Sequence, residues 1–284
     1  MRSKLFWPLA LCSLGLLSLT ACGPSAEQIE KEKYEKEKKD EETLATNKAA
    51  AIEKAKKSLE IQELKPGSGS LVLEDGDLGM VLYRGTRMTG EVFDTNTNAD
   101  GTPLPVRIGG GGVIEGFNFL LKGMKVGQKR KGVLPPILAY GEEGQAPKIQ
   151  PNETLTFEVE VLEIVKANDE SFFTKKILKE GTGAPAQTGD EIFVHYTGRL
   201  TNGKEFDTSR KARNPGEPIK PLNFVLGAGR VIKGWDTGLV GIKKGERRIM
   251  RIGPAAAYGE NAPPTIGPNQ VLEFDIECVD IKPK

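Results

Sequence analysis

The stretch from Phe224 to Gly259 reads FVLGAGRVIKGWDTGLVGIKKGERRIMRIGPAAAYG. Val231, Ile232 and Trp235 are spaced at i, i+1 and i+4, so a short helix would direct all three side chains to one side. The run Arg247–Ile252 follows a Lys-Gly-Glu turn and predicts a strand. This stretch therefore predicts a small helix packed beside a sheet.

Further aromatic side chains extend the same pattern along the chain. Tyr258 follows the predicted strand in a proline-punctuated loop, Tyr196 stands upstream in HYTG, and Phe206-Asp207 stands in KEFDTS. Together with the helix they form a cluster of aromatic and branched side chains with a single carboxylate. Such a site suits an apolar ligand that carries one carbonyl or amide.

The same cluster occurs twice in the chain. Phe93-Asp94-Thr95 returns 113 residues later as Phe206-Asp207-Thr208, and Tyr140 returns 118 residues later as Tyr258. The difference places a five-residue insertion in the second copy. A period this long indicates duplicated domains and not the short units of a solenoid. Two more segments repeat in the same order: Val113–Phe117 as Val231–Trp235, and Pro151–Glu153 as Pro268–Gln270.

Composition excludes several classes of function. The net charge of +1 gives no global field for nucleic acid, so no nucleic-acid partner is expected. His195 is the single histidine, which leaves little material for a histidine-based triad or a histidine-rich metal site. Gly109–Gly112 lacks the Gly-Lys-Ser/Thr ending of a phosphate loop, so we interpret it as a turn. No metal and no cofactor is expected.

Residues 1–22 have the pattern of an export signal. Arg2 and Lys4 precede an apolar run from Leu5 to Leu19, which is too short and wrongly flanked for a spanning helix. The ending Leu-Thr-Ala-Cys at Cys22 resembles a bacterial lipobox, in which the cysteine becomes the lipidated first residue. An ordinary signal peptide cut nearby is the alternative. Lipid on Cys22 would anchor the chain without spanning, at the outer membrane facing the periplasm or otherwise at the cell membrane.

Residues 23–60 form a charged spacer. Glu-Lys pairs at i,i+4 support a helix from Glu27 to Leu64, where no glycine or proline occurs before Pro66. One narrow apolar stripe runs along it, so a solvated spacer and a dimerising helix that makes a homodimer both remain open. Cys278 lies in the last predicted strand, and we expect a buried and inert thiol there.

The remaining chain divides into two domains at residues 61–166 and 170–284. Clean alternation, as in Thr156–Leu162, is typical of half-buried antiparallel strands. The pattern predicts the α+β class, with one short helix per repeat at Gly116–Leu121 and near Trp235. In the second repeat the extra residues fall in the basic, proline-rich loop Ser209–Pro221, which is either a solvated insertion or a surface that contacts a partner.

Both repeats resemble FKBP-type peptidyl-prolyl cis-trans isomerase domains. The segments VHYTGRLTNGKEFDTS, VIKGW, AAAYGENAPP and VLEFDIE follow the family order in the second repeat. The resemblance covers about residues 61–165 and 172–282. It implies two tandem FKBP-like domains, each an antiparallel sheet wrapped around one short helix with a pocket between them. Residues 61–166 form the divergent copy, and residues 170–284 stay closer to the family pattern.

The resemblance also implies which residues form the second pocket. Catalytic positions would be Asp207, Tyr258, Phe206, Trp235 and Phe274, with Trp235 as the floor. Substrate-binding positions would be Tyr196, Arg213, Val231, Ile232 and Ile266. Leu222 stands where the family usually has another phenylalanine.

The first pocket departs from this pattern at several positions. By resemblance it would consist of Tyr83, Phe93, Asp94, Val113, Ile114, Phe117, Tyr140 and Phe157. Phe117 replaces the floor tryptophan, and the loop Thr95–Pro105 contains no arginine. The first copy can therefore be an active domain or one whose aromatic residues serve mainly as core.

Two functions from different classes follow. The first is a lipid-anchored isomerase that acts, chiefly through its second domain, on proline-containing, unfolded or partly folded proteins outside the cytoplasm. The second is a chaperone-like binding protein that uses the same clefts with little catalysis. Macrolides that bind this family are expected as ligands of the second pocket.

Overall fold

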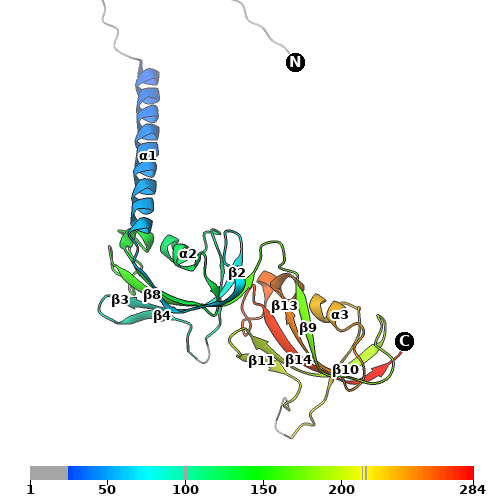
Figure 1. Ribbon diagram of the computed structural model, residues 1–284. Coiled ribbons are helices and arrows are strands. Elements are labelled where there is room, and N and C mark those ends of the chain that lie inside the picture. Colours follow the sequence, from blue (N-terminus) through cyan, green and yellow to red (C-terminus); the bar gives the residue numbers. More distant parts are fainter. Residues whose placement is uncertain (1–24, 99–100, 213, 215) are drawn as a thin grey trace, which may run out of the picture. The chain divides into compact units, whose positions relative to one another are not determined.

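The computed structural model describes residues 25–98, 101–212, 214 and 216–284 (Figure 1). Two residues with expected roles, Cys22 and Arg213, lie outside this description. The chain divides into two units, residues 1–50 and residues 51–284. The second unit contains both sheets of the repeated domains.

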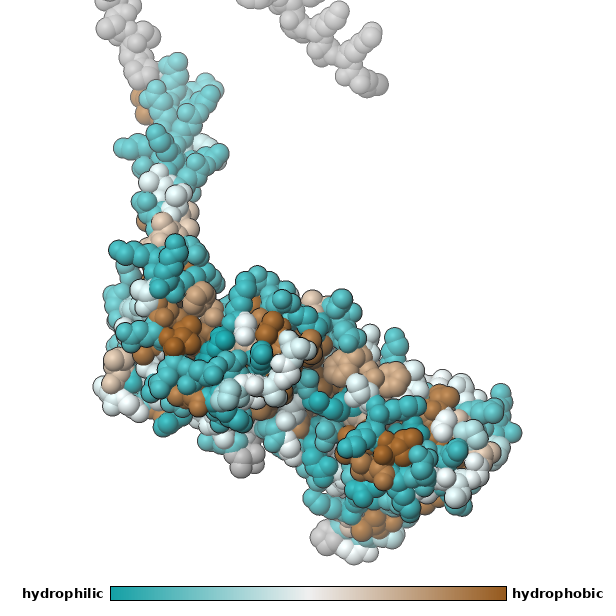
Figure 2. Space-filling view, viewed as in Figure 1, coloured by the Kyte–Doolittle hydropathy of each residue, from teal (hydrophilic) through white to brown (hydrophobic). Residues whose placement is uncertain are grey.

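Helix α1 spans Ala26–Lys57 and contains no buried residue. Ser25 begins it with a reciprocal cap, in which Ser25 Oγ accepts from the Gln28 N–H at 3.2 Å and Gln28 Oε1 accepts from the Ser25 N–H at 2.9 Å. Figure 2 shows mostly hydrophilic side chains along it. Among the described residues, no helix is both long and apolar enough to cross a bilayer.

The predicted extent of this helix is wrong at its C-terminal end. The helix stops at Lys57 and does not continue to Leu64, because Ile61–Lys65 instead forms strand β1 and pairs with the edge of β7. Backbone pairing with the sheet therefore overrides the helical composition of this segment.

The first domain contains an antiparallel sheet of order β1-β7-β8-β3-β4, with β5 also paired to β3. The short strands β2 and β6 pair separately. After β1, the elements are β2 (Ser68–Val72), β3 (Leu78–Arg87), β4 (Val92–Thr95), β5 (Leu104–Arg107), α2 (Glu115–Leu121), β6 (Lys125–Val126), β7 (Lys129–Leu134), the 3₁₀ turn Pro136–Leu138 and β8 (Leu155–Val165).

The second domain repeats this arrangement. Its sheet has the order β11-β10-β14-β13-β9, with β12 paired to β10. The elements are β9 (Phe173–Lys179), β10 (Glu191–Leu200), β11 (Glu205–Thr208), β12 (Leu222–Val225), α3 (Lys233–Gly238), β13 (Arg247–Ile252), the 3₁₀ turns Pro254–Ala256 and Gly259–Asn261, and β14 (Leu272–Lys282).

Each sheet packs against its short helix through a glycine. A Cβ at Gly116 would lie 2.9 Å from Leu134 Cδ1 on β7, and one at Gly234 would lie 2.5 Å from Ile252 Cγ2 on β13. Both helices therefore approach their domains more closely than a side chain at these positions would allow. The buried side chains of α2 include Phe117, Leu120 and Leu121, and α3 buries Trp235. The predicted α+β fold, an antiparallel sheet around one short helix in each repeat, is confirmed (Figure 1).

The duplication extends to the backbone of the loops. Asn152 and Asn269 occupy equivalent places in the repeated Pro-Asn motif, with φ of 56° and 51°. Among the described residues other than glycine, these two alone have positive φ. Asparagine tolerates this left-handed region better than most residues, because its short polar side chain can form local hydrogen bonds.

Candidate functional site

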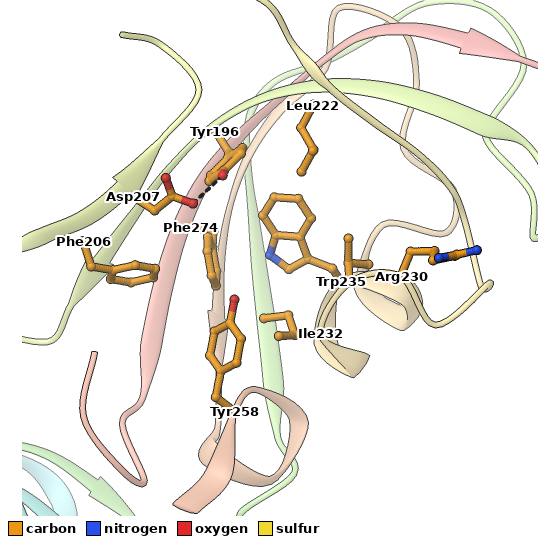
Figure 3. A pocket seen from close by; sticks show the side chains of 10 residues that line it. Tyr196, Phe206, Asp207, Leu222, Arg230, Ile232, Trp235, Tyr258 and Phe274 are labelled. Atoms are coloured by element: carbon orange, nitrogen blue, oxygen red, sulfur yellow. Dashed lines mark hydrogen bonds between the residues drawn. The ribbon is translucent and has the colours of Figure 1, made fainter. Parts of the chain in front are cut away.

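The second domain has an open cleft of about 190 Å³ between its sheet and helix α3 (Figure 3). Its walls are mostly aromatic and branched, with one carboxylate within them and one guanidinium at the rim. The lining residues are Tyr196, Phe206, Asp207, Leu222, Arg230, Val231, Ile232, Trp235, Tyr258 and Phe274.

The sheet places the aromatic wall through one glycine. Gly198 on β10 pairs with Asp207 on β11 and with Phe274 on β14. A Cβ there would lie 2.6 Å from the Phe206 ring and 2.9 Å from the Phe274 ring. The absent side chain leaves room for both rings to lie against the sheet, and Gly85 leaves the same room for Phe93 in the first domain.

The rings hold one another edge to face. Trp235 meets Tyr196 and Phe274 with ring centroids 5.1 Å apart in each pair, at interplanar angles of 85° and 82°. Phe206 meets Phe274 at 5.7 Å and 88°. Such T-shaped pairs add about 0.5–1.5 kcal/mol each beyond area burial. Trp235, 4% exposed, is thereby fixed as the floor of the cleft.

The cleft carries two phenolic hydroxyls with different surroundings. The Tyr196 hydroxyl donates to Asp207 Oδ2 at 2.5 Å, which anchors the carboxylate. The Tyr258 hydroxyl has no hydrogen-bond partner within the described residues, and Figure 3 shows it directed into the cleft. Burial, and secondarily the negative charge of Asp207, raise the pKa of Tyr258 above its usual 10.0. This phenol therefore stays protonated at neutral pH and is available as a donor.

The first domain has a matching but smaller cleft of about 130 Å³. The Tyr83 hydroxyl donates to Asp94 Oδ2 at 2.7 Å, and burial is the main cause that raises the pKa of Tyr140. Phe117 forms its floor and meets Tyr83 and Phe157 edge to face. The lining residues are Tyr83, Phe93, Asp94, Leu104, Gly112, Val113, Ile114, Phe117, Tyr140 and Phe157.

A sequence model described as FKBP-type peptidyl-prolyl cis-trans isomerase matches residues 70–162 and 183–279. The chain belongs to this family. Each matched segment contains one complete cleft, so each FKBP domain has its own cleft.

Curated FKBP proteins show the same similarity over both domains. The chain is 35% identical over 216 residues to peptidyl-prolyl cis-trans isomerase FKBP9 of Rattus norvegicus, covering 76% of this chain and 37% of that protein. It is 35% identical over 218 residues to FKBP10 of Homo sapiens, covering 76% and 36%. FK506-binding protein 4 of Neurospora crassa is 38% identical over 145 residues, covering 51% and 28%. The chain thus spans little more than a third of the length of the first two relatives.

The sequence predicted a set of residues for each cleft, and most of these residues do line it. All eight residues expected in the first pocket do so. In the second, Ile266 is not among the lining residues, although it belongs to the same buried core cluster as Trp235 and Phe274. Arg213 lies outside the described residues. The remaining expected residues of the second pocket all line its cleft.

Sequence reasoning missed Arg230 and its counterpart Gly112 at the rims of the two FKBP clefts. Both residues immediately precede the repeated Val-Ile pair, so the 118-residue offset already aligned them in the sequence. A charge at this position is visible in the sequence, since arginine stands in one copy where glycine stands in the other.

The FKBP clefts offer no set of metal ligands. Within residues 25–98, 101–212, 214 and 216–284, no three His, Cys, Asp or Glu side chains gather as a bound ion would require. What the clefts provide is apolar surface, two hydroxyl groups and one carboxylate, which suits non-covalent chemistry.

Proposed function

We propose that the chain is a peptidyl-prolyl cis-trans isomerase whose main catalytic site is the second cleft. The observation that carries this proposal is the Trp235 floor enclosed by edge-to-face rings, with the free Tyr258 hydroxyl at its mouth. This arrangement combines an apolar floor, from which a bound peptide would displace water, with a donor placed for a peptide carbonyl.

The reaction needs no covalent step. The X–Pro bond resists rotation because its C–N bond has partial double-bond character, with a barrier of about 18–20 kcal/mol for an amide. The planar amide is more charge-separated than the twisted one, so water favours the planar form. A dry aromatic site removes that preference and favours the twisted transition state. A thousandfold acceleration corresponds to about 4 kcal/mol.

Two donors of the cleft can hold the peptide on either side of the proline. The Tyr258 hydroxyl has no competing acceptor within the described residues. The Ile232 backbone N–H, at the start of α3, likewise has none there. Donors already free of partners bind a carbonyl without first breaking a bond. We assign Tyr258 and Ile232 to the two carbonyl groups that flank the rotating bond.

Asp207 has an orienting and electrostatic role in this proposal. Its Oδ2 accepts from Tyr196 at 2.5 Å, which fixes the carboxylate at the wall of the cleft. No proton has to be removed during rotation about an amide bond, so general-base chemistry is not required. The carboxylate instead sets the electrostatic field around the rotating carbonyl.

The first cleft serves mainly as a binding site in this proposal. Its volume is about 130 Å³ against about 190 Å³ for the second, and Phe117 replaces the larger floor residue. These differences support a division of labour in which one cleft turns over and the other retains client chains. A chaperone-like protein with little catalysis is the alternative.

Proline-limited refolding of a test protein, catalysed by the full chain, tests whether the second cleft carries most of the turnover. Asp207→Val should slow catalysed refolding about tenfold, whereas its counterpart Asp94→Val should have a smaller effect. Thermal aggregation of a proline-free client measures binding separately. Aggregation should still be suppressed when both carboxylates are changed. If neither variant lowers the refolding rate, the result favours a chaperone-like binding protein over an isomerase.

Export and lipid attachment complete the proposal. Residues 1–22 and Cys22 lie outside the described residues, so this part is supported by the leader pattern alone. Lipid on Cys22 would anchor both domains at a membrane, with the outer membrane facing the periplasm favoured and the cell membrane as the alternative. Palmitate labelling followed by membrane fractionation tests it. Cys22→Ser should abolish labelling and release the protein, and unchanged labelling would contradict the proposal.

Helix α1 would then separate the domains from the lipid. Its 32 residues bury no side chain and, at about 1.5 Å per residue, reach about 48 Å. Its exposed surface also allows a homodimer formed through this helix. Sedimentation velocity of the full chain distinguishes the two, since a spacer predicts a monomer at every micromolar concentration.

A further inference from the structure

The rims of the two clefts differ in charge around one shared motif. The residues before and after the Val-Ile pair are Gly112 and Glu115 in the first domain, and Arg230 and Lys233 in the second. Gly112 and Arg230 themselves line the clefts. The same two backbone positions therefore carry one negative charge in the first domain and two positive charges in the second.

The charge on the first rim is neutralised locally. Glu115 Oε1 lies 2.6 Å from Lys56 Nζ, near the end of α1, and Glu53 shares the same lysine at 3.0 Å. Arg230 and Lys233 have no ion-pair partner among the described residues, and both are exposed. The motif thus gives the first rim no available cation, whereas the second keeps two cations available for a ligand.

A second hollow continues the cleft of the second domain. It has a volume of about 270 Å³ and shares Tyr196 and Leu222 with the cleft. Lys220, which lines it, has no ion-pair partner within the described part of the chain. Lys211 also lines it but is 2.7 Å from Glu205. Lys220 therefore adds a third available cation beside the same cleft.

The carboxylates near this rim are engaged elsewhere. Asp236 accepts from the Gly227 and Gly229 N–H groups at 2.9 and 2.8 Å, which fixes the loop that ends at Arg230. Glu217, in the hollow, accepts from Asn214 Nδ2 at 2.7 Å. Asp207 is bound by Tyr196. Figure 3 shows the Arg230 side chain at the edge of the cleft, with its guanidinium directed away from the Trp235 floor.

We propose that the second cleft selects proline segments with an acidic residue within two positions of the proline, and that Arg230 is the main specificity-determining residue. Lys220 supports it along the adjoining hollow. The first cleft, with Gly112 at the same position, lacks this preference. The inference deepens the proposed isomerase function and rests on it. Opposite charges steer a ligand and select between partners more than they strengthen binding itself.

The test compares three peptides on the full chain carrying Trp7→Phe, so that Trp235 is the single tryptophan. Each is an acetylated, amidated hexapeptide with a central Leu-Pro and Glu, Gln or Lys following the proline. A second set carries the same residues before the leucine. Affinity is read from Trp235 fluorescence and turnover from the cis-trans exchange rate. At about 20 mM salt, the Glu peptide of one set should bind about fivefold more tightly than its Lys counterpart.

Charge reversal at the rim should invert this order. Arg230→Glu should make the Lys peptide the tighter ligand, and raising the salt to about 500 mM should reduce the preference of the parent chain. Lys175→Glu is the control for net charge, because β9 lies at the opposite edge of the sheet from β11. It should leave the Glu-to-Lys ratio unchanged.

The outcomes separate the two proposals. If all peptides are turned over and bind with equal affinity, the charge preference is overturned and the isomerase proposal stands. The same holds if Arg230→Glu does not change the ratio of the Glu-peptide affinity to the Lys-peptide affinity. Binding of no peptide, together with no turnover, would overturn both. If Lys175→Glu lowers the Glu-to-Lys affinity ratio as much as Arg230→Glu does, the net charge of the domain and not the rim sets the preference. That result would also reject the proposal.

Discussion

The two clefts of this chain match position by position, yet they differ in floor, rim and volume. Tyr83, Phe93 and Asp94 correspond to Tyr196, Phe206 and Asp207, with the same tyrosine-aspartate hydrogen bond in both. The changes fall on Phe117 against Trp235 and on Gly112 against Arg230. Duplication has thus preserved the wall that excludes water and altered the parts that decide which ligand fits.

The interiors behind the clefts show the same contrast. Arg248 is buried, donates to Glu246 Oε1 at 2.6 Å and to the Gly238 carbonyl oxygen at 2.9 Å. Its counterpart Arg130 donates instead to the Leu120 and Lys122 carbonyl oxygens, and Gln128 replaces the glutamate. Arg248 thus has a carboxylate as a direct hydrogen-bond acceptor, whereas Arg130 donates to backbone carbonyl oxygens and feels the Glu63 carboxylate only at longer range.

The largest expected effect concerns this charged pair. Glu246→Gln should destabilise the second domain by about 3 kcal/mol, because it leaves the buried Arg248 guanidinium without its counter-charge. Urea unfolding followed by Trp235 fluorescence measures the change. Gln128→Ala is the matched control in the first domain, and it should leave the Trp235 transition in place. A loss below about 0.5 kcal/mol for Glu246→Gln would show that backbone acceptors suffice in both domains.

The next effect concerns Cys278, whose counterpart in the first domain is Val161. Burial is the main cause that raises the pKa of the Cys278 thiol from 9.0 to about 11. The folded state therefore holds the thiol proton more tightly than the unfolded state does. The resulting contribution to the free energy of unfolding is complete below pH 9 and is lost as the pH rises toward 11. The loss amounts to about 2–3 kcal/mol. Cys278→Val should remove this part of the alkaline loss in urea unfolding measured from pH 8 to 11, and an unchanged pH profile would contradict the assignment.

Sequence alone predicted the walls of both clefts better than their edges. The resemblance of the repeated motifs to the family indicated eight residues for the first cleft, and all eight line it. The motifs did not reveal that Ile266 stays outside the cleft lining, since a motif gives a position but not the face to which a side chain turns. They also failed at Ile61–Lys65, where edge pairing with β7 decides the conformation and no local pattern reveals it.

A smaller effect tests whether the floor residue sets activity. Phe117 contacts Tyr83 and Phe157 edge to face at 5.7 and 5.4 Å, much as Trp235 contacts its neighbours. Phe117→Trp should therefore keep the geometry, enlarge the apolar floor and raise turnover by the first cleft about two- to threefold. The assay is peptide exchange in a Tyr258→Phe background, where the second cleft contributes less. A fall in turnover with an unchanged melting temperature would show that the first cleft is adapted to phenylalanine.

The central claim is that catalysis resides mainly in the second cleft, and one matched pair of variants tests it most directly. Tyr258→Phe and Tyr140→Phe each remove one hydroxyl from equivalent positions, and the Tyr258 ring is 41% exposed, so its fold should be preserved. We would measure kcat/KM of the full chain for a Leu-Pro peptide. Tyr258→Phe should reduce it about fivefold, the value of roughly one hydrogen bond made in the transition state, whereas Tyr140→Phe should change it less than twofold. Equal losses, or a larger loss for Tyr140→Phe, would contradict the claim.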